Sequence, residues 1–351
     1  MQRSIVAHTR PGFEAECARD LLRIGAHAGM EVACAGLPGS AFVTGSGEPF
    51  DSTRWQRAQQ AVPPWFTRSI FVGNGPHRLP ERDRITPLLA LARDHQPPFS
   101  AIWLETPDSN HGKRQSGLCR RLAPLLAQEA RAAGLLEDGA ERRLHALFVA
   151  ADEIWVGTSD RASGSPWPMG IPRLGMPGSA PSRSVLKLAE ALLTFLTAEE
   201  RLKLLRPGMR AVDLGAAPGG WTWELARHGL RVTAIDNGPL KGPIARDPQV
   251  EHLRVDGLNW RPRRPVDWMV CDIVLQPSRI AALVAAWMAD GACGRTIFNL
   301  KLPMKKRYAE VERCAGLIDD ALRQRGVRHS LAFRQLYHDR EEITGYCARP
   351  A

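Results

Sequence analysis

The stretch AVDLGAAPGGWTWELARHG, residues 211–229, decides the fold of this chain. An apolar run at its start is joined to an amphipathic run at its end by the glycine-rich segment 215–220. A strand, a tight glycine loop and a helix, in that order, are typical of the nucleotide crevice of a doubly wound sheet. The stretch therefore predicts a nucleotide-binding crevice and leaves open which nucleotide it binds.

The chain around this stretch alternates between strand-like and helix-like segments from residue 183 onward. Strands are predicted at 210–214, 231–235, 268–271 and 296–300, with two further extended runs at 331–336 and 343–348. Strands that alternate with helices form a mostly parallel sheet with helices on both faces. We therefore expect an α/β, Rossmann-like domain whose ligand lies at the carboxyl ends of the strands.

The glycine loop argues against a dinucleotide. A dinucleotide site uses G-x-G-x-x-G, so that backbone N–H groups meet a pyrophosphate. Here Ala217 takes the place of the second glycine, and Pro218 removes a backbone donor. Asp236 follows the second predicted strand, where a carboxylate accepts hydrogen bonds from ribose hydroxyls. A ligand with a ribose but no phosphate fits both features. S-adenosylmethionine is the common one, and Asp213 would favour its cationic end.

The composition is that of a globular protein with an excess of positive charge. The 351 residues include 47 Lys and Arg against 37 Asp and Glu, a formal net charge of +10. This excess favours a polyanionic partner such as nucleic acid, although an arginine-rich composition without such a partner is the alternative. The seven cysteines are scattered without C-x-x-C pairs, so we expect neither disulfides nor a metal site. No apolar run suits a signal sequence or a membrane span, and we expect a cytoplasmic protein that binds no membrane.

The N-terminal half has a different pattern. Residues 1–62 combine short strands and helices as an α+β subdomain, and residues 63–160 form a second α+β unit. Residues 161–182 are rich in proline and glycine, which suits a linker, and Trp167 and Met169 predict that it packs on a neighbouring surface. The Rossmann-like domain would then cover residues 183–351.

The motif DLGAAPGGW, residues 213–221, resembles the first motif of the FtsJ-like family of RNA 2′-O-ribose methyltransferases. The stretches PSRSVLKLAEA, MGIPRL and SNHGK are similar to the branch of that family that acts on 23S ribosomal RNA and carries an N-terminal THUMP-containing region. The resemblance runs over nearly the whole chain. It implies methylation of a cytidine in the catalytic-centre region of 23S ribosomal RNA, S-adenosyl-L-methionine as cofactor, and a THUMP-like RNA-binding domain at residues 63–160. We expect a monomer without a metal.

The Lys-Asp-Lys-Glu catalytic signature of the family has counterparts in this sequence. The resemblance implies Lys187 and Lys301 as the two lysines and Asp272 as the aspartate. The glutamate falls in the doublet Glu341 and Glu342, of which we prefer Glu342 because it borders the last predicted strand. The resemblance also implies a set of cofactor-binding residues: Ser184, Ala217, Pro218, Gly219, Gly220, Asp236, Asp256 and again Asp272.

These residue types suit methylation of a ribose hydroxyl. A 2′-hydroxyl is a poor nucleophile at neutral pH, so methyl transfer needs in-line placement and help with the proton. A free lysine, with a pKa of about 10.4, is protonated at pH 7. We expect burial and the neighbouring Lys187 to lower the pKa of Lys301, while Asp272 and Glu342 hold both lysines in place. Taken singly, each residue also fits an ordinary solvated loop position.

Other activities leave different marks. A base-carbon methyltransferase needs a cysteine nucleophile, and Cys271 is adjacent to the right strand end, but as the last apolar strand position it is expected in the core. An exocyclic-amine methyltransferase usually shows Asn or Asp followed by Pro-Pro and an aromatic residue, whereas residues 271–274 read Cys-Asp-Ile-Val. The same ribose chemistry on transfer RNA, and a non-catalytic RNA-binding ribosome assembly factor, are the remaining alternatives.

Two basic clusters are candidates for phosphate contacts. Lys305, Lys306 and Arg307 closely follow Lys301, and we expect them beside the active site. We expect a second cluster to extend the same face: Arg261, Arg263 and Arg264. A solvated helix end is the alternative for either cluster.

Overall fold

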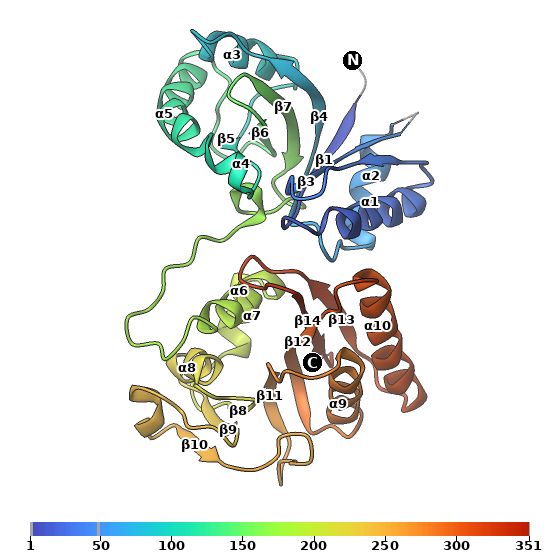
Figure 1. Cartoon of the computed structure of the whole chain (residues 1–351), viewed down its shortest axis with the longest axis vertical. Helices are drawn as coiled ribbons and strands as arrows, with labels where there is room; N and C mark the ends of the chain where they lie inside the picture. Colours follow the sequence, from blue (N-terminus) through green and yellow to red (C-terminus); the bar gives the residue numbers. More distant parts are fainter. Residues whose placement is uncertain (1–2, 48–49, 351) are drawn as a thin grey trace. The chain divides into compact units, whose positions relative to one another are not determined.

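The computed structural model describes residues 3–47 and 50–350 as two compact units, one ending at Pro172 and the other beginning at Arg173 (Figure 1). Residues 1–2, 48–49 and 351, which fall within the predicted ranges 1–62 and 183–351, lie outside this description. The strands of the N-terminal unit are β1 (Ser4–His8), β2 (Ala33–Ala35), β3 (Phe42–Ser46), β4 (Ser69–Arg78), β5 (Ala101–Glu105), β6 (Arg142–Phe148) and β7 (Glu153–Asp160). Its helices are α1 (Glu14–Ala28), α2 (Ser52–Ala61), α3 (Ile85–Arg93), α4 (Asn110–Lys113), α5 (Ser116–Ala132) and the short η1 (Pro168–Gly170).

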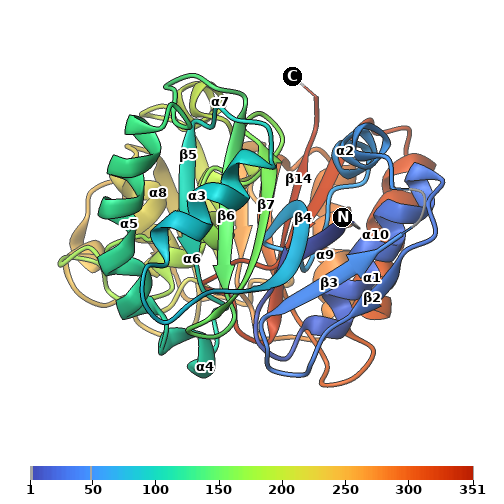
Figure 2. The same cartoon turned by 90° about the horizontal axis from the view of Figure 1, so that it is seen from above.

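The N-terminal unit is built on one seven-stranded sheet in the order β2-β3-β1-β4-β7-β6-β5. All neighbouring strands are antiparallel except β5 and β6. Because β1 pairs with both β3 and β4, the predicted segments 1–62 and 63–160 contribute strands to the same sheet (Figure 2). The α+β pattern predicted for this half is therefore present as one continuous layer of strands.

Two hydrophobic clusters hold helices against this sheet. In α1, Cys17, Leu21 and Ile24 recur at helical spacing, and all three are buried with α2 against β1, β3 and β4. A second cluster, which includes Leu88 and Phe99, joins α3 and α5 to β5, β6 and β7. A third, smaller cluster of Val6, Phe71 and Leu147 joins β1, β4 and β6 within the same sheet.

The first part of the predicted linker packs on this unit. The side chain of Met169 is 7% exposed, and its backbone N–H donates to Glu105 at the end of β5. Gly170 has φ +70°, and a Cβ at this position would lie 2.3 Å from the Arg68 carbonyl oxygen. Only glycine fits such a close approach. The burial of Met169 agrees with the prediction that the linker packs on a surface.

The C-terminal unit carries the alternating strands and helices. Its strands are β8 (Arg210–Leu214), β9 (Arg231–Ile235), β10 (Val250–Leu253), β11 (Val266–Cys271), β12 (Cys293–Lys301), β13 (Ser330–Arg334) and β14 (Glu342–Ala348). Its helices are α6 (Val185–Phe195), α7 (Ala198–Leu204), α8 (Gly220–Arg227), η2 (Pro243–Arg246), α9 (Pro277–Ala289) and α10 (Arg307–Gln324).

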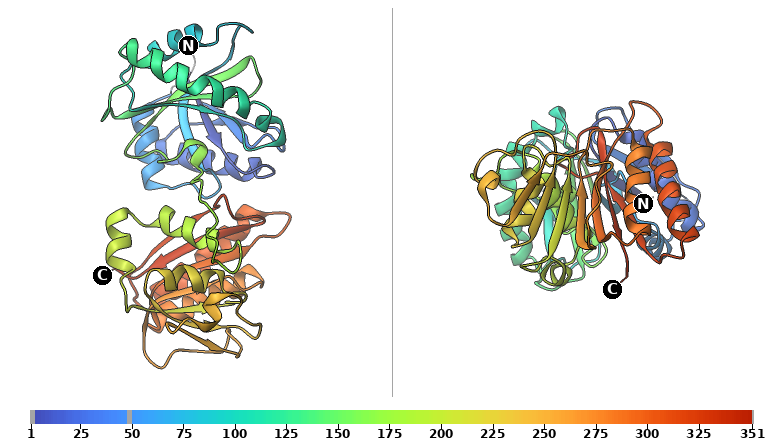
Figure 3. Two further views of the ribbon diagram at one scale, coloured as in Figure 1. Left: turned by 90° about the vertical axis from the view of Figure 1, so that its left-hand side faces the viewer. Right: turned by 90° about the horizontal axis from the view of Figure 1, so that it is seen from below.

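The sheet order of this unit is β10-β9-β8-β11-β12-β14-β13. The first five strands are parallel, and β14 pairs antiparallel with β12 and β13, so the predicted mostly parallel α/β fold is confirmed. Helices α6 and α8 share a core with one face, whereas α9 and α10 pack together and α9 lies against β12 (Figure 3). The prediction missed β10, a four-residue edge strand with little apolar alternation.

Two further observations bear on the sequence-based expectations. None of the helices in the described parts of the chain is long and apolar enough to cross a bilayer. All seven cysteines are free thiols.

Candidate active site

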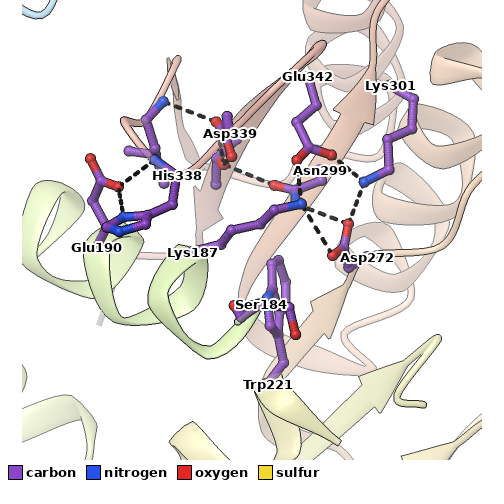
Figure 4. A network of polar contacts seen from close by, with 12 residues as sticks. Ser184, Lys187, Glu190, Trp221, Asp272, Asn299, Lys301, His338, Asp339 and Glu342 are labelled. Atoms are coloured by element: carbon purple, nitrogen blue, oxygen red, sulfur yellow. Dashed lines mark hydrogen bonds and ion pairs between the residues drawn. The ribbon is translucent and has the colours of Figure 1, made fainter. Parts of the chain in front are cut away.

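Four charged side chains from separate elements meet at the carboxyl end of the C-terminal sheet (Figure 4). Lys187 lies in α6, Asp272 directly follows β11, Lys301 ends β12, and Glu342 begins β14. Parallel pairing puts the ends of β11 and β12 side by side, and the antiparallel register of β12 and β14 places Lys301 opposite Glu342. Sheet order therefore assembles a cluster that we call the four-charge ring.

Positive and negative groups alternate around the ring. Nζ of Lys301 lies 2.6 Å from Oδ1 of Asp272 and also donates to Oε2 of Glu342. Nζ of Lys187 lies 3.6 Å from Oδ2 of Asp272 and contacts Oε1 of Glu342. Each lysine thus contacts both carboxylates. The side chains of both lysines remain partly exposed, Lys187 at 17% and Lys301 at 25%.

The register of β14 separates the two glutamates of the doublet. Glu342 faces the lysines and its side chain is only 6% exposed. Glu341 points away, is 61% exposed, and forms an ion pair with Arg307 at 2.7 Å. The pairing of Lys301 with Glu342 at the first residue of β14 therefore brings Glu342, and not Glu341, into the ring.

The pKa of Lys301 differs from the sequence-based expectation. Burial acts to lower this pKa, as expected, but the adjacent carboxylates of Asp272 and Glu342 outweigh burial and raise it above the ordinary lysine value. The expected lowering is therefore wrong for this arrangement, because the prediction weighed burial and a second cation but not two carboxylates in direct contact. Lys301 is an ammonium group in the protein alone.

A network of buried polar side chains supports Asp272 through hydrogen bonds. The sequence analysis did not predict this network. Nδ2 of Asn299 donates to Asp272 at 3.0 Å, and the Thr344 hydroxyl donates to Oδ1 of Asn299 at 2.8 Å. Thr344 lies 3.0 Å from a carboxyl oxygen of Asp339, whose pKa is raised well above its ordinary value by burial. Asn299 lies two residues before Lys301 on β12 and therefore on the same face. A polar residue inside the apolar run TIFNL was the signal for it.

The glycine loop brings the start of α8 against the start of α6. A Cβ at Gly220 would lie 2.1 Å from Oγ of Ser184 and 3.0 Å from the backbone N of Val185, so the two helix starts are closely packed here. Indole Nε1 of Trp221 donates to the Ser184 carbonyl at 3.1 Å. Gly219, with φ +110°, precedes α8 in a conformation that favours glycine. Ser184 and the loop residues Ala217, Pro218, Gly219 and Gly220 thus lie around one end of two helices, next to Lys187.

Two more predicted cofactor residues follow strands at the same edge. Asp236 follows β9 and accepts hydrogen bonds from the backbone N–H groups of Ala217 at 2.9 Å and Gly238 at 2.7 Å. Its carboxylate therefore shapes the glycine loop and keeps lone pairs for further donors. Asp256 lies in an exposed turn after β10, where it accepts from Leu258 N at 2.9 Å. Among the described residues, no hydrogen bond or ion pair joins Asp256 to another member of the predicted set.

Asp213 is a buried acid at the end of β8. Burial raises its pKa to about 7, even though the Thr222 hydroxyl donates to Oδ2 at 2.6 Å. Its Oδ1 is buried and has no hydrogen-bond partner among the described residues. A buried carboxylate oxygen without a donor is costly unless a cation or a donor approaches it. The site therefore has an unsatisfied negative group beside the glycine loop.

Cys271 does not suit a nucleophile. Its side chain is fully buried, and burial raises the pKa of its thiol to about 12. A reactive cysteine needs an accessible thiolate. The structure thus agrees with the expectation that Cys271 belongs to the core. Within residues 3–47 and 50–350, no group of three or more His, Cys, Asp or Glu side chains is arranged to hold a metal ion.

The two basic clusters lie at different ends of the sheet. Lys305 and Lys306 are exposed just after β12, at the edge that carries the four-charge ring. Arg261, Arg263 and Arg264 precede β11 and line a groove with Arg210, the first residue of β8. The expectation that this arginine cluster extends the face beside Lys301 is therefore wrong. Residues 261–264 directly precede β11, and residues that precede a parallel strand lie at the amino end of the sheet, opposite to Lys301.

Comparisons with known proteins place the chain in a family. A family model for FtsJ-like methyltransferases matches residues 180–298, and a model for the N-terminal part of ribosomal RNA large subunit methyltransferase M matches residues 83–160. The ribosomal RNA large subunit methyltransferase M of Azoarcus sp. (strain BH72) is 49% identical over 354 residues, covering 97% of this chain and 95% of the relative. The protein of that name from Methylococcus capsulatus (strain ATCC 33009 / NCIMB 11132 / Bath) is 49% identical over 98% of this chain and 97% of the relative.

Among solved structures, TrmN from Thermus thermophilus is 16% identical, with a TM-score of 0.36 over 99% of this chain and 100% of that chain, and a likeness this weak adds nothing to the assignment. The family assignment rests on the relatives that are 49% identical over nearly their full length. On their basis, this chain belongs to the family of ribosomal RNA large subunit methyltransferase M proteins and carries an FtsJ-like methyltransferase domain in its C-terminal half.

Proposed function

We propose that this protein transfers a methyl group from S-adenosyl-L-methionine to the ribose 2′-hydroxyl of a cytidine in 23S ribosomal RNA. The single observation that carries the proposal is the four-charge ring, in which two lysines and two carboxylates alternate at the carboxyl end of the sheet. The ring holds two cations in fixed positions, and both lysines stay partly exposed. A hydroxyl brought to this edge would meet a positioned ammonium group.

The residues next to the ring fit the cofactor. The unpaired, buried Oδ1 of Asp213 is a partner for a cation or a donor, and Gly219 and Gly220 add no side chain of their own to the start of α8. Asp236 would accept from ribose hydroxyls, and Ser184 and residues 217–220 would line the remainder. When bound, S-adenosyl-L-methionine supplies an electrophilic methyl group on a sulfonium. Asp256 and Asp272 complete the proposed set.

The four-charge ring would position the hydroxyl and manage its proton. The raised pKa of Lys301 favours a charged role, in which its ammonium group holds the 2′-oxygen and stabilises negative charge that develops there. The carboxylates of Asp272 and Glu342 are the bases in direct contact with Lys301, and one of them would take the hydroxyl proton. Lys187 would keep both carboxylates oriented through its own contacts.

The N-terminal unit would serve RNA binding. We place a THUMP-like RNA-binding domain at residues 63–160, after the subdomain 1–62 and before the linker 161–182, and these boundaries remain predictions. Phosphate contacts from such a domain position an RNA without reading its sequence. A ribosomal RNA substrate would place the reaction in the cytoplasm, and we keep the expectation of a monomer.

Methyl transfer to RNA tests the proposal directly. Purified protein and labelled S-adenosyl-L-methionine are incubated with 23S ribosomal RNA transcript, with 16S ribosomal RNA transcript, or with bulk transfer RNA. We expect label only in the first, recovered as 2′-O-methylcytidine after nuclease digestion. Label in transfer RNA, label on a base, or no transfer to any RNA by a folded protein that binds the cofactor would each contradict the proposal. The last result would favour an assembly factor.

A further inference from the structure

A groove with a volume of about 1220 Å³ lies in the C-terminal unit at the amino ends of β8, β9 and β11. We call it the arginine groove. Its charged lining residues are Arg210, Arg231, Glu251, Arg261, Arg263 and Arg264. Five cations face one anion there, whereas the whole chain has 47 basic against 37 acidic residues. The groove is therefore far more basic than the composition of the chain alone would produce.

The groove exists because one face of the outer strands is not covered by a helix. On β9, the buried Val232 and Ala234 face the core that contains α8, so the alternate residues Arg231 and Thr233 face the other way. On that side α9 packs on β12, towards the other edge of the sheet (Figure 1). The chain between β10 and β11 crosses back without forming a helix. The outer strands thus keep an open, polar face.

The five arginines fall into two groups. Arg210 donates to the Pro265 carbonyl, and Arg261 donates to the carbonyls of Leu258 at 3.0 Å and Trp260 at 2.7 Å, so these two brace the wall of the groove. The side chains of Arg231, Arg263 and Arg264 are exposed and have no hydrogen-bond or ion-pair partner within the described part of the chain. Besides Glu251, the acidic Asp267 lies at the margin, where it accepts from the backbone N–H of Arg210 at 2.8 Å.

We propose that the arginine groove binds the sugar-phosphate backbone of the RNA substrate at a second place, away from the methylated nucleotide. The proposal rests on the proposed function. Unpaired guanidinium groups in a concave, basic surface match phosphate oxygens in charge and in geometry. Five residue steps along β8 separate Arg210 from Gly215 of the glycine loop, a distance of about 16 Å along the strand. An RNA that reaches both places must therefore extend well beyond its target nucleotide.

The variant Arg231→Gln/Arg263→Gln/Arg264→Gln tests the groove. Its matched control is Arg323→Gln/Arg325→Gln/Arg328→Gln, which removes the same charge from exposed arginines at the end of α10 and before β13. Affinity for full-length 23S ribosomal RNA transcript is measured without cofactor from 50 to 200 mM salt. Circular dichroism checks that both variants fold.

We expect the groove variant to lower the slope of log affinity against log salt by about 2 to 3, since each phosphate contact contributes about 0.7 to 0.9. The ratio of wild-type to variant affinity should then shrink roughly 16- to 64-fold between 50 and 200 mM salt. The control should keep the wild-type slope. We also expect the groove variant to methylate the shortest RNA fragment that the wild type accepts at an unchanged rate under saturating conditions.

An unchanged slope in the folded groove variant, or an equal loss in the control, would overturn the proposal, as would a lost methylation rate on the short fragment. A groove that binds another protein instead would give the first of these results. If the wild type transfers no methyl group to any RNA, the proposed function fails by itself. The binding measurements still decide about the groove, because they contain no cofactor and no turnover.

Discussion

Two clusters in which carboxylates meet cationic or ionisable groups, one in each unit, differ in access to solvent. In the N-terminal unit, Glu105 contacts Nδ1 of His145 at 2.8 Å and Nε2 of His8 at 3.4 Å, and the side chains of Glu105 and His145 are fully buried. In the C-terminal unit, the lysines of the four-charge ring remain 17% and 25% exposed. The side chains of the first cluster are enclosed by the protein. The lysines of the second cluster lie at a surface that a substrate can reach.

This difference in exposure indicates that the Glu105 cluster stabilises the fold, whereas the four-charge ring is available for catalysis. Oε1 of Glu105 also accepts the backbone N–H of Met169, so the carboxylate ties the linker to the sheet. Nε2 of His145 lies 2.7 Å from the Ser159 hydroxyl on the neighbouring strand. Every one of these partners is a structural element of the N-terminal unit. We therefore expect changes at Glu105 to alter stability and changes at Lys301 to alter catalysis.

The largest effect is expected at Lys301. Lys301→Ala should lower the rate of methyl transfer by about 10²- to 10⁴-fold, the usual contribution of a positioned catalytic group, with cofactor affinity nearly unchanged. Lys301→Arg should restore part of the rate, because the raised pKa of Lys301 favours a charged role and arginine keeps the charge. Single-turnover transfer with saturating cofactor measures both. Arginine as inactive as alanine, with a rate that rises with pH, would instead show a neutral lysine base.

The second effect is expected at Glu105, on stability and not on catalysis. Glu105→Gln breaks a buried contact with two histidines and should lower the free energy of unfolding of the N-terminal unit by about 3 to 5 kcal/mol. Urea unfolding, monitored by hydrogen exchange of the backbone amides of residues 3–172, measures this loss of free energy. The exposed pair of Glu199 and Lys203, at 2.6 Å, supplies the control Glu199→Gln, which should cost less than about 1 kcal/mol. Equal losses in both variants would remove the distinction between the clusters.

The pH dependence of this stability has a definite sign. Burial acts to raise the pKa of Glu105, but His145 and His8 outweigh it and hold that pKa below its usual range. The folded pKa thus lies below the unfolded value of about 4.3, so the stabilisation is present above pH 4.3 and is lost as the pH falls through the folded value. We therefore expect that the stability of the N-terminal unit in the Glu105→Gln variant no longer contains the decrease at acidic pH that protonation of Glu105 causes in the wild type.

A smaller effect is expected at Asp236. Asp236→Ala should weaken S-adenosyl-L-methionine binding by about 1.5 to 3 kcal/mol, the scale of a hydrogen bond to a charged group. The loss of its bonds to Ala217 and Gly238 adds to the cost by loosening the loop. Calorimetry on the folded variant gives the affinity, with Asp320→Ala as the comparison because Asp320 lies in α10, outside the proposed cofactor set, and its side chain is 72% exposed. Unchanged affinity in the Asp236 variant would exclude Asp236 as a cofactor ligand.

The smallest effect is expected from Asp213, as a dependence of cofactor affinity on pH. Burial raises its pKa to about 7, so the carboxyl is protonated below that pH and ionised above it. A cationic cofactor favours the ionised form, so affinity should rise by up to about tenfold between pH 6 and pH 8. Titration calorimetry at several pH values should show this rise in the wild type and a flat profile in Asp213→Asn. A flat wild-type profile would contradict the assigned role.

The sequence by itself determined the elements whose signals are local. The strand, glycine loop and helix at residues 210–227 follow from apolar periodicity and from glycines that leave room for close contacts, and the structure contains β8 and α8 there. The alternation of strands and helices likewise predicted the mostly parallel sheet. Neighbouring residues decide these features, so a linear pattern contains the information.

Only the tertiary structure decided how distant groups meet. The contact of Lys187 with Glu342 depends on β14 lying beside β12, and the choice between Glu341 and Glu342 depends on strand register. The raised pKa of Lys301 depends on two carboxylates that outweigh burial, a balance set by distances of a few ångströms. The arginine groove depends on Arg210 of β8 and Arg231 of β9 lying beside residues 261–264. Electrostatic energies and contacts vary with separation in space, and separation along the chain does not determine it.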